Sequence, residues 1–214
     1  MMNKLYWHTV TPLLKEILIL LMQSSVFDEF RLVGGTALSL QRGHRMSIDI
    51  DLFTDVEYSS IDFDKIETFL KSTFPYCQTS NLPVGMGTSY FIGKDKDNAV
   101  KLDLYYADKF IGDILHVEGV RIAQLEDIVA MKLDVIQYTG RKKDFWDIHE
   151  LMDTYSFKEM LAFHQKRYPY THDAKLIRKN ILHCANASDD FNPICLRNKN
   201  WDFIVLDLID FVST

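Results

Sequence analysis

The segment Ile48 to Phe53 constrains the fold more than any other part of the chain. Apolar and acidic residues alternate in it, which predicts a strand with Asp49 and Asp51 on one face and apolar side chains on the other. The two Cα atoms lie roughly 6.5–7 Å apart on such a strand, so the carboxylates repel each other once water is excluded. A divalent cation relieves that repulsion, because magnesium prefers carboxylate and phosphate oxygens. An exposed strand that alternates acidic and apolar residues is the alternative interpretation.

A glycine pair comes before this strand. Phe30 to Val33 is a short apolar run that predicts another strand, and Gly34 and Gly35 follow it as a tight turn into a helix. We expect Thr36 to be the N-cap of that helix. Glycines at a helix N-terminus let a phosphate approach the backbone N–H groups, and the Thr36 hydroxyl adds a donor. A turn that binds nothing is the alternative.

The rest of the pattern divides the chain in two. Apolar spacing predicts helices over residues 11–29 and 62–71, with strands over 76–80, 88–93 and 99–106. Beyond about residue 123 it predicts helices over 124–138, 142–155, 156–168, 172–186 and 201–212. We therefore predict an α+β fold, with a mixed sheet and flanking helices over residues 1–123 and a helical region over 124–214.

Charge and composition exclude some classes of protein. The net charge of −6 argues against a general nucleic-acid coat. Residues 158–200 nevertheless hold eight Lys or Arg against four Asp or Glu, which indicates either an RNA contact or a solvated helical surface. The apolar stretch from Ile17 to Met22 is too short to span a bilayer, and the three cysteines lack a paired zinc spacing. We expect a reduced, cytoplasmic protein that does not enter a membrane.

Three segments together resemble a known family. The stretch GGTALSLQRGHRMSIDIDLF (34–53) resembles the first motif of the AbiEii/AbiGii toxin family, within the DNA polymerase β-like nucleotidyltransferase superfamily. LEDIVAMKLDVI (125–136) and GRKKDFWDIHEL (140–151) resemble the later motifs of that family. The residues that match the first motif are Gly34, Gly35, Thr36, Leu38, Arg45, Ser47, Asp49, Asp51 and Leu52. The chain beyond residue 155 carries no recognised motif.

The resemblance implies a metal site with three carboxylates. Two magnesium ions are expected at Asp49 and Asp51 and, in many members of the superfamily, at a third carboxylate on a neighbouring strand. Asp103 is our candidate for the third, because it lies on the polar face of an otherwise apolar strand. An ordinary exposed residue on an edge strand is the alternative for Asp103.

The resemblance also draws the second half of the chain into the site. It implies that Lys132 lies against the triphosphate of an NTP, whereas a lysine in an apolar helix otherwise extends to solvent. It makes Asp144 a member of the active site. Asp147 shares the helix face of Asp144 and acts directly, orients Lys132 or Arg141, or caps charge structurally.

Two polar residues lie just ahead of the predicted metal strand. Arg45 either binds phosphate or fixes the loop through a salt bridge. Ser47 lies on the same face as Asp49 and bonds either a ligand or the turn.

The implied function is metal-dependent transfer of a nucleoside monophosphate from an NTP to an acceptor hydroxyl, with release of pyrophosphate. The resemblance points to the toxin of a toxin–antitoxin or phage-defence system, with a separately encoded antitoxin and with tRNA as the leading acceptor. One alternative is transfer to a hydroxyl of a protein or a small molecule. Others are a degenerate nucleotide-binding or antitoxin module and a purely structural α/β domain.

Overall fold

The computed structural model describes residues 4–79 and 85–213. Its helices are Pro12–Gln23 (α1), Gly34–Arg42 (α2), Phe63–Thr73 (α3), Leu125–Tyr138 (α4), Lys142–Leu151 (α5), Phe157–Arg167 (α6), Ala174–Leu182 (α7) and Trp201–Ser213 (α8). Short 3₁₀ helices are Trp7–Thr9 (η1), Ser25–Phe27 (η2) and Cys184–Ala187 (η3). The strands are Arg31–Leu32 (β1), Asp49–Thr54 (β2), Tyr76–Thr79 (β3), Gly87–Gly93 (β4), Ala99–Tyr106 (β5), Leu115–Val117 (β6) and Val120–Ile122 (β7).

Within the described residues the strands form one seven-stranded sheet in the order β3-β4-β5-β2-β1-β7-β6. Strand β2 runs parallel to β5 and β1 runs parallel to β7, while the other neighbours are antiparallel. The sheet is therefore mixed, and the predicted α+β class is confirmed. Strand β5 lies between β4 and β2 rather than at an edge, so the edge-strand alternative for Asp103 is wrong.

Strand alternation decides which side chains of β2 and β5 enter the core. Ile50 and Leu52 on β2 and Leu102 and Leu104 on β5 are fully buried. The residues between them face the opposite side and remain half-buried. The parallel pairing puts Asp51 directly opposite Asp103. The apolar positions thus fix the register that brings these two acidic residues together.

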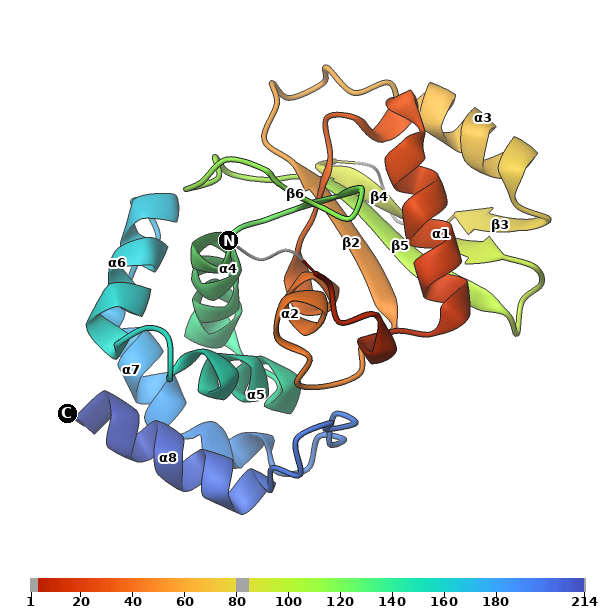
Figure 1. The fold of residues 1–214 in the computed structure, drawn as a ribbon. Coiled ribbons are helices and arrows are strands. Elements are labelled where there is room, and N and C mark those ends of the chain that lie inside the picture. Colours follow the sequence, from red (N-terminus) through yellow and green to blue (C-terminus); the bar gives the residue numbers. More distant parts are fainter. Residues whose placement is uncertain (1–3, 80–84, 214) are drawn as a thin grey trace.

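The two halves of the chain occupy different parts of the molecule (Figure 1). The sheet lies with α1, α2 and α3, whereas α5, α6, α7 and α8 gather on the other side and α4 stands between the two groups (Figure 1). Helix α4 packs against α5, α6 and α7 as well as against α2. This contact places the helices beyond residue 124 next to the turn that opens α2.

Several predicted elements end earlier than expected. The helix predicted over 11–29 ends at Gln23, because Ser24 has extended backbone angles and a separate 3₁₀ turn follows. The helix predicted over 142–155 ends at Leu151. Ile48, expected on the buried face of the metal strand, precedes β2 and is 66% exposed. The strand predicted over 76–80 is described as far as Thr79, and Ser80 lies outside the described residues.

One prediction about local structure is wrong, and one element was missed. Thr36 is not an N-cap, because α2 begins at Gly34 directly after β1 and Val33 occupies the cap position. The β6–β7 hairpin was not expected at all. Its turn is the pair Glu118 and Gly119, both with positive φ, which is typical of a two-residue hairpin turn.

No helix in the described ranges combines the length and apolarity that crossing a bilayer requires. The three cysteines, Cys77, Cys184 and Cys195, are all unpaired thiols.

Candidate active site

The three acidic residues predicted on strands converge on one cavity. Asp49 and Asp51 come from β2 and Asp103 from β5, and together with Gly34 and Gly35 they line a cavity of about 270 Å³. We call it the carboxylate cavity. The structure therefore places all three aspartates beside the glycine turn.

The glycine turn is shaped around one of these carboxylates. Gly34 has a φ of +68°, a conformation that side chains other than glycine rarely adopt. A Cβ atom at Gly34 would also collide with the Asp51 carboxylate. The backbone of the turn therefore lies in direct contact with the acidic group, which only glycine permits.

The strand carboxylates have too little positive charge around them. Burial, followed by the charges of Asp103 and Asp49, raises the pKa of Asp51 to about 6. Lys101 donates to one oxygen of Asp103 at 2.6 Å. The other oxygen, Oδ1, is buried and accepts no hydrogen bond from any residue within 4–79 or 85–213. A buried acceptor without a donor is unfavourable, and a bound cation would satisfy this oxygen.

This arrangement fits the expected divalent ion. No group of three or more His, Cys, Asp or Glu side chains in the described chain is already arranged as a complete metal site. Magnesium commonly takes only one or two carboxylates and completes its shell with water and substrate phosphates. Asp103 Oδ1 has no hydrogen-bond donor among the described residues, and the pKa of Asp51 is raised. A divalent ion would bind the first oxygen and stabilise the ionised form of the second carboxylate.

The acidic residues on α5 are in a different situation. The Nζ of Lys132 lies 2.7 Å from Asp144 Oδ1 and 2.7 Å from Asp147 Oδ2. Arg45 adds two hydrogen bonds to Asp147, at 2.6 and 2.8 Å, and His44 Nε2 lies 2.9 Å from the same carboxylate. All five side chains are buried. We call them the helix ion cluster.

Charge compensation is visible in the pKa values of this cluster. Burial acts to raise the pKa of Asp147, but Arg45 and Lys132 hold it well below its usual value. Burial likewise opposes the lowered pKa of Asp144, which follows from Lys132 and Arg141. For Lys132, burial lowers the pKa, yet Asp147 and Asp144 outweigh it and the net pKa is raised. The neighbours therefore favour the ionised forms of the two aspartates and Lys132, whereas burial lowers the pKa of His44 and favours its neutral form.

The contacts of Lys132, Arg45 and Asp147 bear on the alternatives that the sequence left open for these residues. Lys132 lines the carboxylate cavity but is only 6% exposed, so its ammonium does not extend to solvent. Arg45 makes a bidentate salt bridge within the protein. Asp147 contacts Lys132, as expected, whereas Arg141 bonds Asp144 instead, through its Nε at 3.0 Å.

Ser47 lines the carboxylate cavity, and the buried Thr36 packs behind it. The Thr36 hydroxyl donates to Ser47 Oγ at 2.8 Å and also contacts the backbone oxygen of Asp49. Thr36 is 1% exposed. Both contacts tie α2 to the start of β2, so the structure places this hydroxyl in the support of the metal strand.

Three residues near the site were not singled out from the sequence. Lys101 and Lys143 line the carboxylate cavity, and His44 belongs to the helix ion cluster. A signal existed for Lys101, because it lies two residues before Asp103 and so shares its strand face. Lys143 directly precedes Asp144 in the third segment that resembles the family.

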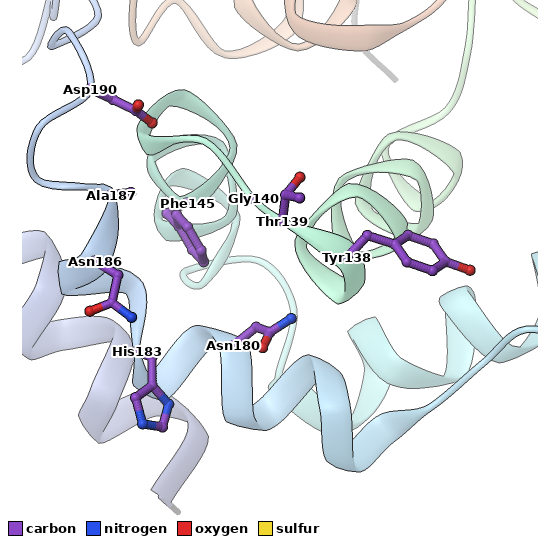
Figure 2. Close-up of a pocket in the computed structure, with 9 residues that line it drawn as sticks. All are labelled: Tyr138, Thr139, Gly140, Phe145, Asn180, His183, Asn186, Ala187 and Asp190. Atoms are coloured by element: carbon purple, nitrogen blue, oxygen red, sulfur yellow. The ribbon is translucent and has the colours of Figure 1, made fainter.

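A separate cavity of about 220 Å³ lies between the end of α4, the start of α5, α7 and η3 (Figure 2). Two of its polar side chains already have partners. The Asn180 amide donates to two backbone oxygens of α4 at 2.8 Å, and Asp190 accepts from the Lys142 N–H at 2.9 Å. The strand carboxylates are not among the residues labelled in Figure 2. We interpret this cavity as a packing gap between helices.

Comparison with known proteins gives matches over most of the chain. The model of a family described as "Nucleotidyl transferase AbiEii toxin, Type IV TA system" matches residues 17–211. The uncharacterized protein aq_aa25 of Aquifex aeolicus is 28% identical over 184 residues, which cover 82% of this chain and 84% of that protein.

Solved structures share the fold. A putative nucleotidyltransferase from H. pylori has a TM-score of 0.63 at 18% identity, covering 94% of this chain and 90% of its own. MenT4, a nucleotidyltransferase toxin of Mycobacterium tuberculosis H37Rv, has a TM-score of 0.59 at 17% identity, covering 94% and 81%. At such identities the likeness concerns the fold.

Proposed function

Because the chain belongs to the AbiEii nucleotidyl transferase toxin family, and is thus a nucleotidyltransferase, we propose that it transfers a nucleoside monophosphate from an NTP to an RNA hydroxyl. The leading acceptor is tRNA. The observation that carries the proposal is the convergence of Asp49, Asp51 and Asp103 on one cavity beside the turn of Gly34 and Gly35.

The glycine turn binds the triphosphate in this proposal. Helix α2 begins at Gly34, so its first N–H groups are free of partners within the helix and carry the positive end of the helix dipole. Gly35 brings the backbone close to Arg45, whose Nη2 would clash with any larger residue there. Backbone donors and a fixed positive charge together favour an anion at this edge of the cavity.

The strand carboxylates hold the metal. Two magnesium ions at Asp49, Asp51 and Asp103 would activate the acceptor hydroxyl and neutralise the triphosphate. Asp51 must be ionised for this role, and its raised pKa means that it competes for a proton near pH 6. Catalysis then rests on positioning and on electrostatic preorganisation rather than on a covalent intermediate.

The helix ion cluster completes the site from the other half of the chain. Its salt bridges connect Lys132 on α4 and Asp147 on α5 to Arg45 just before β2. We propose that Asp144 and Lys132 act beside the triphosphate, since both line the carboxylate cavity. Asp147 faces three buried cationic or imidazole groups and serves to position them.

The acceptor and the biological setting rest on other observations. The positive excess over residues 158–200 supports an RNA acceptor, because phosphate neutralisation drives such binding. The family description supports the role of a toxin in a toxin–antitoxin system. We further propose a separately encoded antitoxin, a cytoplasmic location and a role in phage defence.

The proposal is tested with purified protein, magnesium, each of the four labelled NTPs and total cellular RNA. We expect label in the tRNA fraction, with release of pyrophosphate and no label when EDTA is present. The double variant Asp49→Asn/Asp51→Asn is the matched control, since it keeps the shape of both side chains and removes their charge. Equal labelling by this variant would show that the carboxylates do not carry the reaction.

Separate fractions distinguish the remaining acceptors. Label in the protein fraction or in small molecules alone would identify a protein or small-molecule hydroxyl as the acceptor. Failure of the wild-type protein to bind any NTP in the presence of magnesium would identify a degenerate module.

A further inference from the structure

A larger, more apolar cavity opens directly beside the carboxylate cavity. Its volume is about 490 Å³, and the two cavities share Arg45, Ser47, Asp49, Arg141 and Lys143 in their linings. We call it the apolar cavity. One ligand with a polar end and a flat apolar end can therefore extend across both.

The apolar side of this cavity comes from two distant parts of the chain. Ile48 precedes β2, whereas Phe191 and Ile194 belong to the loop before α8. These three side chains are 66%, 100% and 68% exposed. Apolar groups so open to water gain free energy when a flat ligand covers them.

The loop that supplies this wall is held in place. Met46 donates its N–H to the Ile194 oxygen at 2.9 Å. Lys142 donates from Nζ to the Asp190 oxygen at 2.6 Å and from its backbone N–H to the Asp190 carboxylate at 2.9 Å. Figure 1 shows the loop before α8 extending toward the connection between α2 and β2. Its two ends are thus fixed to residues that flank the active site.

Cationic groups stand where the two cavities meet. Lys143 is half-buried, and no side chain in the described ranges forms a hydrogen bond or salt bridge with it. Arg141 uses its Nε for Asp144 but is 58% exposed. By contrast, the ammonium of Lys132 is shared between two carboxylates. Lys143 is therefore a free cation facing the boundary between the carboxylate and apolar cavities.

We propose that the apolar cavity binds the base and sugar of the NTP and that Lys143 bonds a phosphate at the boundary. This inference rests on the proposed function. The triphosphate lies against the glycine turn and the carboxylates, and the nucleoside extends between Ile48 and the loop from Asp190 to Ile194. A cavity of this volume lies within the range for small ligands. The loop then determines which base the enzyme accepts, because it supplies five of the thirteen residues that line the cavity, Phe191 and Ile194 among them.

A nucleotide fits this position better than the end of an RNA chain does. A nucleotide has one triphosphate next to one base, which matches one polar cavity next to one apolar cavity. An RNA chain requires a path for successive phosphates, yet beyond the shared boundary Lys142 already uses its ammonium on the backbone of the loop.

Calorimetry on the full-length protein with magnesium tests the proposal, using each of the four NTPs and inorganic triphosphate as probes. We expect Phe191→Ala and Ile48→Ser to weaken NTP binding about tenfold, as the loss of a base contact does, and to leave inorganic triphosphate binding unchanged. Lys143→Gln should weaken the binding of both probes. Tyr170→Ala is the matched control, because Tyr170 is a 99% exposed aromatic residue outside both cavities and should change neither.

The outcomes separate this inference from the proposed function. If the wild-type protein binds NTPs and none of the three variants alters that binding, the cavity is not the nucleoside site. If Phe191→Ala raises KM for RNA and leaves KM for the NTP unchanged, the cavity binds the acceptor and the inference is overturned while the proposed function stands. If the wild-type protein binds no NTP, the proposed function itself fails. Melting temperatures of all variants exclude unfolding as a cause.

Discussion

Two groups of aspartates lie around the same cavity, and they differ in how their charge is compensated. On the strands, Lys101 is the only residue of 4–79 and 85–213 that forms a salt bridge with Asp49, Asp51 or Asp103, and the pKa of Asp51 is raised to about 6. On helix α5, Asp144 and Asp147 are surrounded by cations and their pKa values are lowered. Both groups are acidic and both line or adjoin the site, yet only one is short of positive charge.

This difference separates carboxylates that stabilise the fold from carboxylates that bind a ligand. A carboxylate whose charge is already balanced by salt bridges contributes to holding two elements together. A carboxylate whose charge is not balanced gains free energy from a ligand that brings positive charge. Asp147 and its partners are thus expected to matter chiefly for the folded structure, and the strand carboxylates for metal binding; Lys132 and Asp144, which also line the cavity, serve both.

The largest effect is expected from Asp147→Ala. This change leaves Lys132, Arg45 and His44 buried around a missing carboxylate, and breaking a buried ion pair on one side costs about 3–5 kcal/mol of unfolding free energy. Urea unfolding measures it. The control Asp207→Asn removes a carboxylate that also contacts a histidine but is 57% exposed, and should cost less than about 1 kcal/mol. Equal stabilities for the two variants would show that the buried salt bridges of the helix ion cluster do not stabilise the fold more than an exposed pair does.

The second effect is a loss of activity that leaves the stability of the fold intact. Asp51→Asn should lower the transfer rate by about 10²–10³-fold, the loss expected for one preorganised electrostatic group. Its folding should be unharmed or improved, because the variant removes a charge that repels Asp103 and Asp49. Initial rates with labelled NTP and the urea midpoint are measured on the same preparation. A loss of stability as large as that of Asp147→Ala would show that Asp51 is structural.

The third effect is stabilisation by magnesium. A ligand that binds only the folded state at 100 times its Kd adds about 2.7 kcal/mol to the unfolding free energy. We expect thermal unfolding to shift upward with magnesium and to return when EDTA removes the metal. The Asp49→Asn/Asp51→Asn variant should not respond, whereas Asp144→Asn should still respond. A response that survives in the double variant would place the metal elsewhere.

The features that depend on neighbouring residues in the chain could be predicted from the sequence. Alternation in the segment from Ile48 to Phe53 was sufficient to place Asp49 and Asp51 on one strand face, because strand periodicity is local. The position of Asp103 on a strand was equally local. That it lies opposite Asp51 depends on the pairing of β2 with β5, which a single sequence does not encode in any short pattern.

The contacts between residues far apart in the sequence required the structure. The salt bridge between Arg45 and Asp147 joins residues 102 positions apart and depends on how α5 packs. The same holds for the loop around Phe191, which carries no motif and yet lines a cavity beside Asp49. Thr36 was misassigned for a related reason. Its hydroxyl bonds Ser47 and Asp49, which are close only after β2 has docked against α2.

The fourth effect is a pH dependence that the two groups should not share. The pKa of Asp51 is raised above its ordinary value of 3.8, so the folded state binds a proton more tightly than the unfolded state does. Its contribution to stability is present below about pH 4 and is lost as the pH rises through about 6. Magnesium must displace that proton, so its affinity should fall by up to about tenfold per unit below pH 6.

Calorimetric titration of magnesium between pH 5 and 8 measures this dependence. The Asp144 and Asp147 carboxylates, with lowered pKa values, should remain ionised over the whole range and contribute no slope there. An affinity that is constant down to pH 5 would mean that Asp51 is already ionised and that its charge is compensated.

The smallest effect tests Lys101, the cation that the described part of the chain pairs with a strand carboxylate. Lys101 is paired with Asp103 at 2.6 Å but is 38% exposed, so the pair should stabilise the protein by less than about 1 kcal/mol. Lys101→Met keeps the length of the side chain and removes the ammonium, which frees both oxygens of Asp103. We expect almost no change in the urea midpoint and a modestly higher magnesium affinity, because the ion no longer competes with a lysine. A lower magnesium affinity would mean that Lys101 helps to assemble the metal site, and the strand carboxylates would then resemble the helix ion cluster more than the charges around them indicate.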